Sequence, residues 1–189
     1  MRYAPEHNEE ARKRILEAAS RLFRTHGIAA VGLAKIMAEA DLTVGTFYTH
    51  FDSKQALVRE ALLHTRQELL EQALRRGDLE GAVRAYLRPE HRDAPGAGCP
   101  VAALASEVAR QPRKTRHSFV SHVEPSLDLL AACLAKRRGQ KVGRDDAAAF
   151  FGLLVGTLQL ARATADPAES SAILEAGIRA ALLLANGGR

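Results

Sequence analysis

Residues 43–51 read TVGTFYTHF, and this stretch decides which fold the chain is expected to adopt. Phe47 and Phe51 are four residues apart, so on a helix they share one side and can anchor it to a small core. The opposite side offers small or neutral hydrogen-bonding groups: Thr43, Val44, Gly45, Thr46, Tyr48, Thr49 and His50. A helical glycine costs about 1 kcal/mol relative to alanine, but it lets another molecule approach the backbone closely. The pattern therefore predicts a surface that contacts nucleic acid.

Two helical segments are expected before this stretch. The first is expected at Glu9–Thr25, where apolar residues recur at helical spacing, and the second at Leu33–Glu39. Ala40–Asp41–Leu42 is expected to be a turn, with Thr43 capping a helix over Val44–His50. Two short helices joined by a tight turn after a longer helix form a helix-turn-helix. This motif places the start of its second short helix in the DNA major groove.

The remainder of the chain also favours helix, and no segment has the alternating pattern of a strand. Further helices are expected at Ser53–Arg75, Leu79–Leu87, Cys99–Arg110, Arg113–Arg137, Arg144–Thr164 and Ala168–Asn186. Residues 88–98, RPEHRDAPGAG, are expected to form an irregular loop. Pro125 is expected to kink or split the helix that contains it. The sequence therefore predicts an all-α fold of about nine helices, with a three-helix DNA-binding domain at 1–52 and a helical ligand-binding and dimerisation domain at 53–189.

Composition and charge restrict the possible functions less than the motif does. The 189 residues carry a formal net charge of +5, but residues 1–60 hold nine Lys/Arg and eight Asp/Glu. The total charge therefore does not locate a nucleic-acid surface. The first residues are too charged for a signal peptide, and the longest uncharged run near the C-terminus, 147–161, has 15 residues, against about 20 for a membrane span. We expect a cytoplasmic protein with reduced cysteines.

Residues 10–60 resemble the DNA-binding domain of the TetR family of regulators. The signature consists of Ile36, Ala40, the whole of 43–51, Lys54 and Leu57. The resemblance implies phosphate contacts from Thr43, Tyr48 or Thr49, His50 and Lys54. It implies base readout from Val44, Gly45, Thr46 and Tyr48.

Three positions depart from the family pattern. Val31–Gly32 stands where the family usually has Ser or Thr, which puts a phosphate contact there in doubt. Lys35 replaces a commonly acidic residue and is a candidate for a substitute phosphate contact. Asp41 replaces the usual turn glycine, and we expect the turn to survive because Asp tolerates left-handed backbone geometry.

Structural roles remain open for three of the candidate contacts. Tyr48 is alternatively a core aromatic with its hydroxyl at the surface, His50 a helix cap, and Lys54 a solvated lysine. Phe47, Phe51 and Leu57 are assigned to the core.

The last two expected helices are apolar on more than one face, which suggests burial against a second subunit. The residues predicted for this dimer interface are Phe151, Leu154, Leu158, Ile178 and Leu182. Gly152 and Gly156 are one turn apart and would allow close helix approach. A dimer would place two reading helices in successive major grooves of a palindromic site. A monomeric core is the alternative.

The middle helices are expected to enclose an effector pocket. Candidate pocket residues are Tyr86, Cys99, His117, Phe119, His122 and Gln159. Cys99 begins a helix, which would lower the pKa of its thiol and suit a sensor of oxidants or electrophiles; packing of a small buried residue is the alternative. The spacing of His117 and His122 does not place them on one helix face, so no metal site is predicted. Cys133 is expected to be core.

The sequence contains no phosphate-binding glycine loop, no HExxH and no GxSxG, so it does not predict an enzyme. It predicts no cofactor. An architectural DNA-binding protein is the other alternative, and it would need a larger basic surface. The prediction is a ligand-responsive transcriptional regulator, a repressor that binds a palindromic operator as a homodimer and is released by a small-molecule or electrophile inducer.

Overall fold

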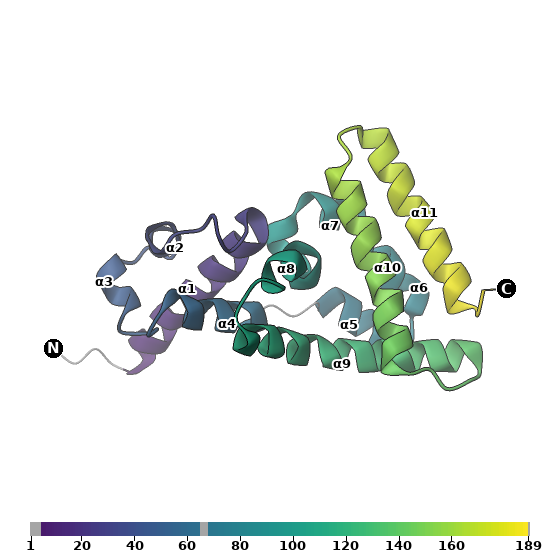
Figure 1. Ribbon diagram of the computed structural model, residues 1–189, viewed down its shortest axis with the longest axis horizontal. Coiled ribbons are helices and arrows are strands. Elements are labelled where there is room, and N and C mark those ends of the chain that lie inside the picture. The colour runs from purple at the N-terminus through teal and green to yellow at the C-terminus, as the bar shows by residue number, and fades with distance from the viewer. Residues whose placement is uncertain (1–4, 65–67, 189) are drawn as a thin grey trace.

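The computed structural model describes residues 5–64 and 68–188, and every regular element in these ranges is a helix (Figure 1). The α-helices are α1 (Pro5–His26), α2 (Leu33–Glu39), α3 (Val44–Phe47), α4 (Lys54–His64), α5 (Glu68–Arg75), α6 (Leu79–Tyr86), α7 (Pro89–Asp93), α8 (Pro100–Val108), α9 (Arg113–Arg138), α10 (Arg144–Ala163) and α11 (Pro167–Ala185). A 3-10 helix, η1 (Pro95–Ala97), lies between α7 and α8. The all-α prediction is confirmed.

The buried side chains form two cores. The N-terminal core contains α1 to α4 together with Leu104, Val108 and Phe119. The C-terminal core is built by α5, α6, the start of α8, α9, α10 and α11. In Figure 1, α9 runs from beside α4 to the base of the α10–α11 hairpin. It therefore contributes to both cores, with Phe119 in the first and Leu134 in the second.

The prediction of an irregular loop at 88–98 is wrong, since α7 and η1 lie within it. Pro89 and Pro95 each occupy the first turn of their element. Proline suits that position because its fixed φ is already helical and its missing N–H has no partner in a first turn anyway. These two prolines start short helices, which the sequence prediction treated only as breaks.

One other helix prediction is corrected in part, and one lies partly outside the described residues. Of the predicted kink or split at Pro125, the split does not occur, because α9 is one helix from Arg113 to Arg138. The predicted continuous helix Ser53–Arg75 crosses residues 65–67, which lie outside the described residues; α4 and α5 cover its two sides. The capping residue of α4 is Ser53, whose hydroxyl accepts from the Ala56 N–H at 3.1 Å.

Candidate nucleic-acid interface and effector pocket

The turn before α3 adopts the left-handed geometry expected of it. Asp41 has φ of 53° and is the one non-glycine residue with positive φ in the described backbone. The Arg14 guanidinium donates to the Asp41 carboxylate at 3.2 Å and to its carbonyl at 3.3 Å. The Leu42 N–H donates to the Met37 carbonyl at 2.9 Å and closes the turn. These contacts fix the angle between α2 and α3.

α3 is amphipathic, as predicted. Phe47 is completely buried and its ring stacks on Phe51 with centroids 5.7 Å apart. The opposite side is open to solvent: Tyr48 is 65% exposed and Val44 is 43% exposed. Thr43, Gly45 and Thr49 are exposed, whereas Thr46 and His50 are half-buried. The expectation that Tyr48 could be a core residue is therefore not met.

α3 is shorter than the predicted Val44–His50. The N–H groups of Thr49 and His50 bond to the carbonyls three residues earlier, at 3.2 and 3.0 Å, which tightens the chain into a turn after Phe47. The Thr49 hydroxyl also donates to the Thr46 carbonyl at 2.7 Å and competes with a helical bond. Thr43 occupies the N-cap position, but its hydroxyl lies 2.9 Å from that of Thr46 and caps no backbone N–H.

The basic side chains that are predicted to contact DNA around α3 differ in how available they are to a partner. Lys35 is exposed. Lys54 is half-buried, and its ammonium donates to the Ile28 carbonyl at 3.0 Å, so it also fastens the α1–α2 connection. Burial lowers the pKa of His50, and the nearby Arg12 lowers it further, which keeps the ring neutral at pH 7. Of these three side chains, Lys54 is the one that makes an observed hydrogen bond to the protein, whereas Lys35 is exposed.

The comparisons with known proteins agree with this geometry. Residues 15–61 match the family model described as "Bacterial regulatory proteins, tetR family". A solved TetR-family transcriptional regulator from Streptomyces coelicolor, SCO4454, is 25% identical, with a TM-score of 0.70 over 94% of this chain and 97% of that one. Residues 15–61 belong to the TetR family of regulatory proteins.

Other relatives match this chain over a shorter length or less closely in sequence. The HTH-type transcriptional regulator TtgR of Pseudomonas putida is 37% identical over 83 residues, which cover 44% of this chain and 39% of TtgR. YerO of Bacillus subtilis, an uncharacterized HTH-type transcriptional regulator, is 40% identical over 52 residues, covering 28% and 18% of the two chains. The chain thus matches two fifths or less of these curated relatives. The reduced form of E. coli NemR, 20% identical with a TM-score of 0.72 over 90% of this chain and 94% of that one, shares the fold.

A cavity of about 260 Å³ opens between α5, α6 and the α7–α8 segment. Its lining residues are Leu70, Ala85, Tyr86, Arg88, Glu90, His91, Ala94, Ala97, Gly98 and Cys99. Tyr86 and Cys99 were predicted pocket residues. The other four predicted residues do not line it: His117 and Gln159 are exposed, His122 is half-buried on α9, and Phe119 packs in the N-terminal core.

The environment of Cys99 does not produce the reactive thiol suggested by its place at a helix start. Cys99 is 2% exposed, and burial raises the pKa of its thiol, which the neighbouring Tyr86 hydroxyl opposes only in part. Its sulfur accepts from the Ala102 N–H at 3.4 Å and so caps α8. Cys133 is also buried, as predicted, and its thiol donates to the Leu74 carbonyl at 3.1 Å. A raised pKa leaves little thiolate at neutral pH.

His91 holds the wall of the cavity together. Its Nε2 accepts from the Cys99 N–H at 3.0 Å, so Nδ1 carries the proton and donates to the Tyr86 carbonyl at 2.7 Å. Burial lowers the pKa of His91, which agrees with this neutral form. The ring therefore joins the end of α6 to the start of α8 across residues 88–99, which we name the 88–99 strap.

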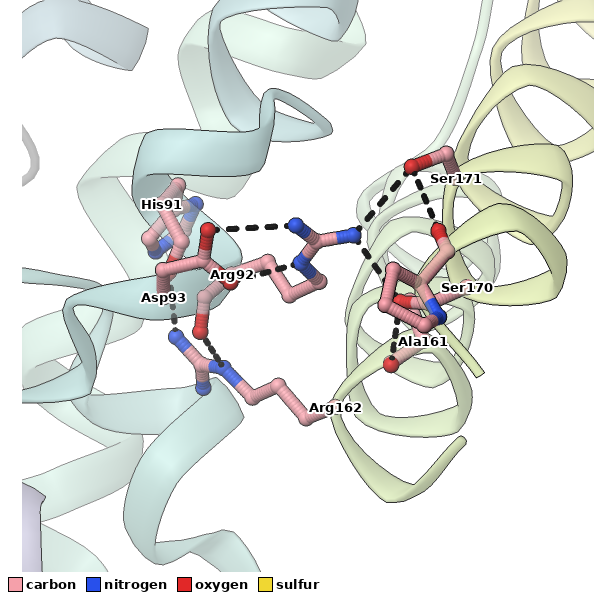
Figure 2. A network of polar contacts seen from close by, with 8 residues as sticks. His91, Arg92, Asp93, Ala161, Arg162, Ser170 and Ser171 are labelled. Atoms are coloured by element: carbon pink, nitrogen blue, oxygen red, sulfur yellow. Dashed lines mark hydrogen bonds and ion pairs between the residues drawn. The ribbon is translucent and has the colours of Figure 1, made fainter. Parts of the chain in front are cut away.

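One end of the strap is fixed to the α10–α11 hairpin (Figure 2). The Arg162 guanidinium donates to the carbonyls of His91 and Arg92 at 2.6 and 3.0 Å, and so satisfies two carbonyls at the end of α7. Arg92 pairs with Asp93 at 2.7 Å and also donates to the Ser170 hydroxyl at 3.0 Å. Figure 2 shows Arg92 between Asp93 and the two serines of α11.

The other end is fixed to the DNA-binding domain. The Arg24 guanidinium on α1 donates twice to the Gly96 carbonyl, at 2.9 and 2.5 Å, and also to the Ser20 hydroxyl. Ser20 in turn donates to the Ala61 carbonyl on α4 at 3.0 Å. Burial lowers the pKa of Arg24 to about 10, so it stays charged at neutral pH. The strap thus connects the cavity wall directly to α1.

The residues predicted for the dimer interface lie inside the subunit. Phe151, Leu154, Leu158 and Ile178 are at most 5% exposed, and Leu182 packs against the same core. The exposed face of the α10–α11 hairpin carries a different set of apolar and small residues: Ala148, Gly152, Gly156, Leu160, Ala163, Ala172, Ala176, Ala180 and Leu183. Leu160 is 64% exposed, and a Cβ added at Gly156 would meet no atom within 4 Å. We name this surface the hairpin face.

Across the described ranges, no helix combines the length and the apolar character needed to cross a bilayer. In those ranges, no three His, Cys, Asp or Glu side chains are grouped so as to hold a metal ion.

Proposed function

We propose that this chain is a transcriptional repressor that binds a palindromic operator as a homodimer and releases it when a small molecule occupies the cavity beside the 88–99 strap. The observation that carries the proposal is α3, whose buried side is held by Phe47 and whose solvent side offers Gly45, Thr46 and Tyr48. Neutral hydroxyls, a bare backbone and a helix start together suit base edges and phosphates.

The operator can be found by selecting duplexes from a randomised pool with the full-length protein. We expect the selection to enrich an inverted repeat whose two half-sites are read independently. Two or three base changes in one half-site should lower the affinity of the protein for the duplex sharply. Enrichment of no common sequence would favour the architectural DNA-binding alternative. Either result is obtained without knowing the effector.

Dimerisation is proposed through the hairpin face. Its small residues allow two helices to approach closely, and Leu160 and Leu183 supply exposed apolar side chains near its two ends. The resemblance to TetR-family proteins, whose dimers pair their last two helices, supports the same arrangement. The glycines and alanines take the role that the sequence prediction gave to the larger buried residues.

A non-covalent effector fits the cavity better than an electrophile does. The buried Tyr86 hydroxyl and the Cys99 thiol lie in a mostly apolar lining, and the pKa of Cys99 is raised. A few polar groups in an apolar pocket are typical of small-molecule sites. The electrophile hypothesis is tested by Cys99→Ser, which on that hypothesis should abolish induction by alkylating agents.

We further propose that the 88–99 strap transmits occupancy of the cavity to α1. A ligand that displaces the strap disturbs the Gly96 carbonyl and so the Arg24 contact. Allosteric coupling of this kind amounts to about 1–3 kcal/mol, or roughly 5- to 150-fold in affinity.

A bulky side chain in the cavity should imitate the effector. We expect Ala85→Phe to weaken operator binding at least ~5-fold, and we expect a second change, Arg24→Met, to remove most of that effect. The four proteins of this double-mutant cycle are compared by operator affinity, with unfolding midpoints measured alongside. Ala132→Phe, at an exposed site on α9, is the control. If Ala85→Phe weakened operator binding equally with and without Arg24, the proposed transmission through the 88–99 strap would be refuted.

A further inference from the structure

Four basic side chains and no acidic one lie between the end of α8 and the second turn of α9. They are Arg110, Arg113, Lys114 and Arg116, here named the 110–116 basic cluster. All four are exposed. Across residues 5–64 and 68–188, no salt bridge joins any of them to a carboxylate. Their charges are therefore available to a partner.

The charge of the cluster equals the net charge of the sensing part of the chain. Residues 61–189 contain 18 Lys/Arg and 14 Asp/Glu, a net charge of +4. The cluster alone carries +4, so the remainder of 61–189 has equal numbers of acidic and basic residues. A second basic segment, residues 136–144, holds five Lys/Arg, but Arg137, Arg138 and Arg144 are bonded to other parts of the protein.

This segment is fastened to the DNA-binding domain. The Gln55 side chain, one residue after Lys54, lies 3.3 Å from that of Gln111 in the middle of the cluster. The Glu107 carboxylate accepts from the N–H groups of Ile28 and Ala29 at 2.9 and 3.2 Å. Val108 and Phe119, on either side of the cluster, are buried in the N-terminal core. The cluster is thus a rigid continuation of the surface at the start of α4.

The charges of the cluster do not help its own helix. Three of them lie in the first turn of α9, where the helix dipole disfavours positive charge and where no acidic residue is present. By contrast, α10 begins with Asp145 and Asp146, and α11 has Glu169 in its first turn. A polyanion beside the cluster would relieve this unfavourable arrangement.

We infer that the 110–116 basic cluster contacts backbone phosphates of the operator duplex next to those contacted by α3 and α4. The inference rests on the proposed function, because it needs the helix-turn-helix to bring the duplex to this side of the molecule. Duplex DNA is the partner because the cluster adjoins the proposed DNA-reading domain and because phosphates require charge without sequence-specific geometry. The cluster adds affinity, not sequence preference.

The test removes three charges as Arg113→Gln, Lys114→Gln and Arg116→Gln. The matched control removes three exposed charges elsewhere, as Arg76→Gln, Lys136→Gln and Lys141→Gln. Lys136 lies about 33 Å from Lys114 along α9, at 1.5 Å per residue. Operator affinity is measured over a series of salt concentrations, and ethylation interference maps the contacted phosphates.

We expect the cluster variant to bind the operator about tenfold or more weakly at low salt. If two side chains per subunit meet phosphates, the slope of log affinity against log salt should fall by about 3.6 for the dimer. The preference for operator over scrambled duplex should stay unchanged, and some phosphates mapped for the wild type should no longer interfere. The control variant should keep the wild-type slope and phosphate map.

Three results would overturn the inference. In the first, the cluster variant keeps the wild-type slope of log affinity against log salt. In the second, the control variant loses as much slope as the cluster variant, and the effect is then one of total charge. Loss of binding to phosphatidylglycerol vesicles with DNA binding intact would assign the cluster to a membrane surface. Failure of the proposed function itself is distinguishable, since the wild type would then show no preference for any selected duplex.

Discussion

Replacing Gly156 and Leu160 together by glutamate should convert the dimer into a folded monomer and weaken operator binding by on the order of 100-fold or more, since the avidity of two linked half-sites is lost. Both positions are open in the isolated subunit: Leu160 is 64% exposed, and nothing lies within 4 Å of a Cβ added at Gly156. Glutamate also favours helix over glycine. The subunit should therefore remain folded while two charges per chain enter the proposed interface.

The oligomeric state is measured by sedimentation or light scattering over a range of protein concentrations. The control places the same two charges outside the hairpin face, as Gln72→Glu and Ala132→Glu at exposed positions. The control should remain dimeric. If the Gly156→Glu/Leu160→Glu protein remained dimeric, the hairpin face would not be the interface. If it became a monomer that still bound the operator at wild-type affinity, a dimer would not be needed for operator binding.

Phe47→Ala should lower the free energy of unfolding by about 3–5 kcal/mol, the usual cost of removing a buried phenylalanine. The ring is completely buried and stacks on Phe51, and Arg12 lies over the other side of that pair, 4.9 Å from the Phe51 ring centroid. Operator binding should be lost as well, because α3 would no longer be held against the core.

Tyr48→Ala provides the matched control for stability, since Tyr48 is the next residue and is 65% exposed. Its ring meets Phe47 edge-on, with centroids 5.1 Å apart, so we expect a loss below about 1 kcal/mol. Denaturation is followed by circular dichroism at one fixed protein concentration, because the stability of a dimer depends on concentration. Equal losses for the two variants would contradict the amphipathic assignment of α3.

The sequence was most informative where one helix has two unlike sides. Phe47 and Phe51 are large and apolar whereas Gly45, Thr46 and Tyr48 are not, so periodicity alone separates the buried from the exposed side of the segment. The left-handed turn at Asp41 was also predictable, because few residues tolerate positive φ. These features depend on local structure, which sequence spacing describes directly.

The hairpin face was less predictable because α10 and α11 are apolar on several sides. Hydrophobicity pointed to the largest residues, and Phe151 and Leu154 fill the core of their own subunit. The signal that was available is the series Gly152, Gly156 and Leu160, spaced four apart, which marks an exposed side of small residues. Which of two apolar sides faces inward is set by the packing of other helices, which spacing does not reveal.

The effector cavity depends on contacts between distant segments. Aromatic character predicts Tyr86 as a pocket residue and a helix start predicts Cys99, whereas the prediction of an irregular loop at 88–98 gives His91 no role. Arg24 was also missed, since nothing in α1 indicates that its guanidinium reaches Gly96, 72 residues away. His117 and Gln159 were suggested by residue type, and their exposure removes them from the cavity.

The claim on which the account depends is that the solvent side of α3 lies against DNA, and Gly45→Ala measures it most directly. A methyl group at Gly45 would meet only the Thr43 hydroxyl, at 3.8 Å, an ordinary contact distance. The fold should therefore be unchanged or stabilised by up to about 1 kcal/mol. Affinity for the selected operator should nevertheless fall at least ~10-fold, because the methyl group separates the backbone from the duplex. A Gly45→Ala protein that is equally stable and binds the operator with wild-type affinity would contradict the account.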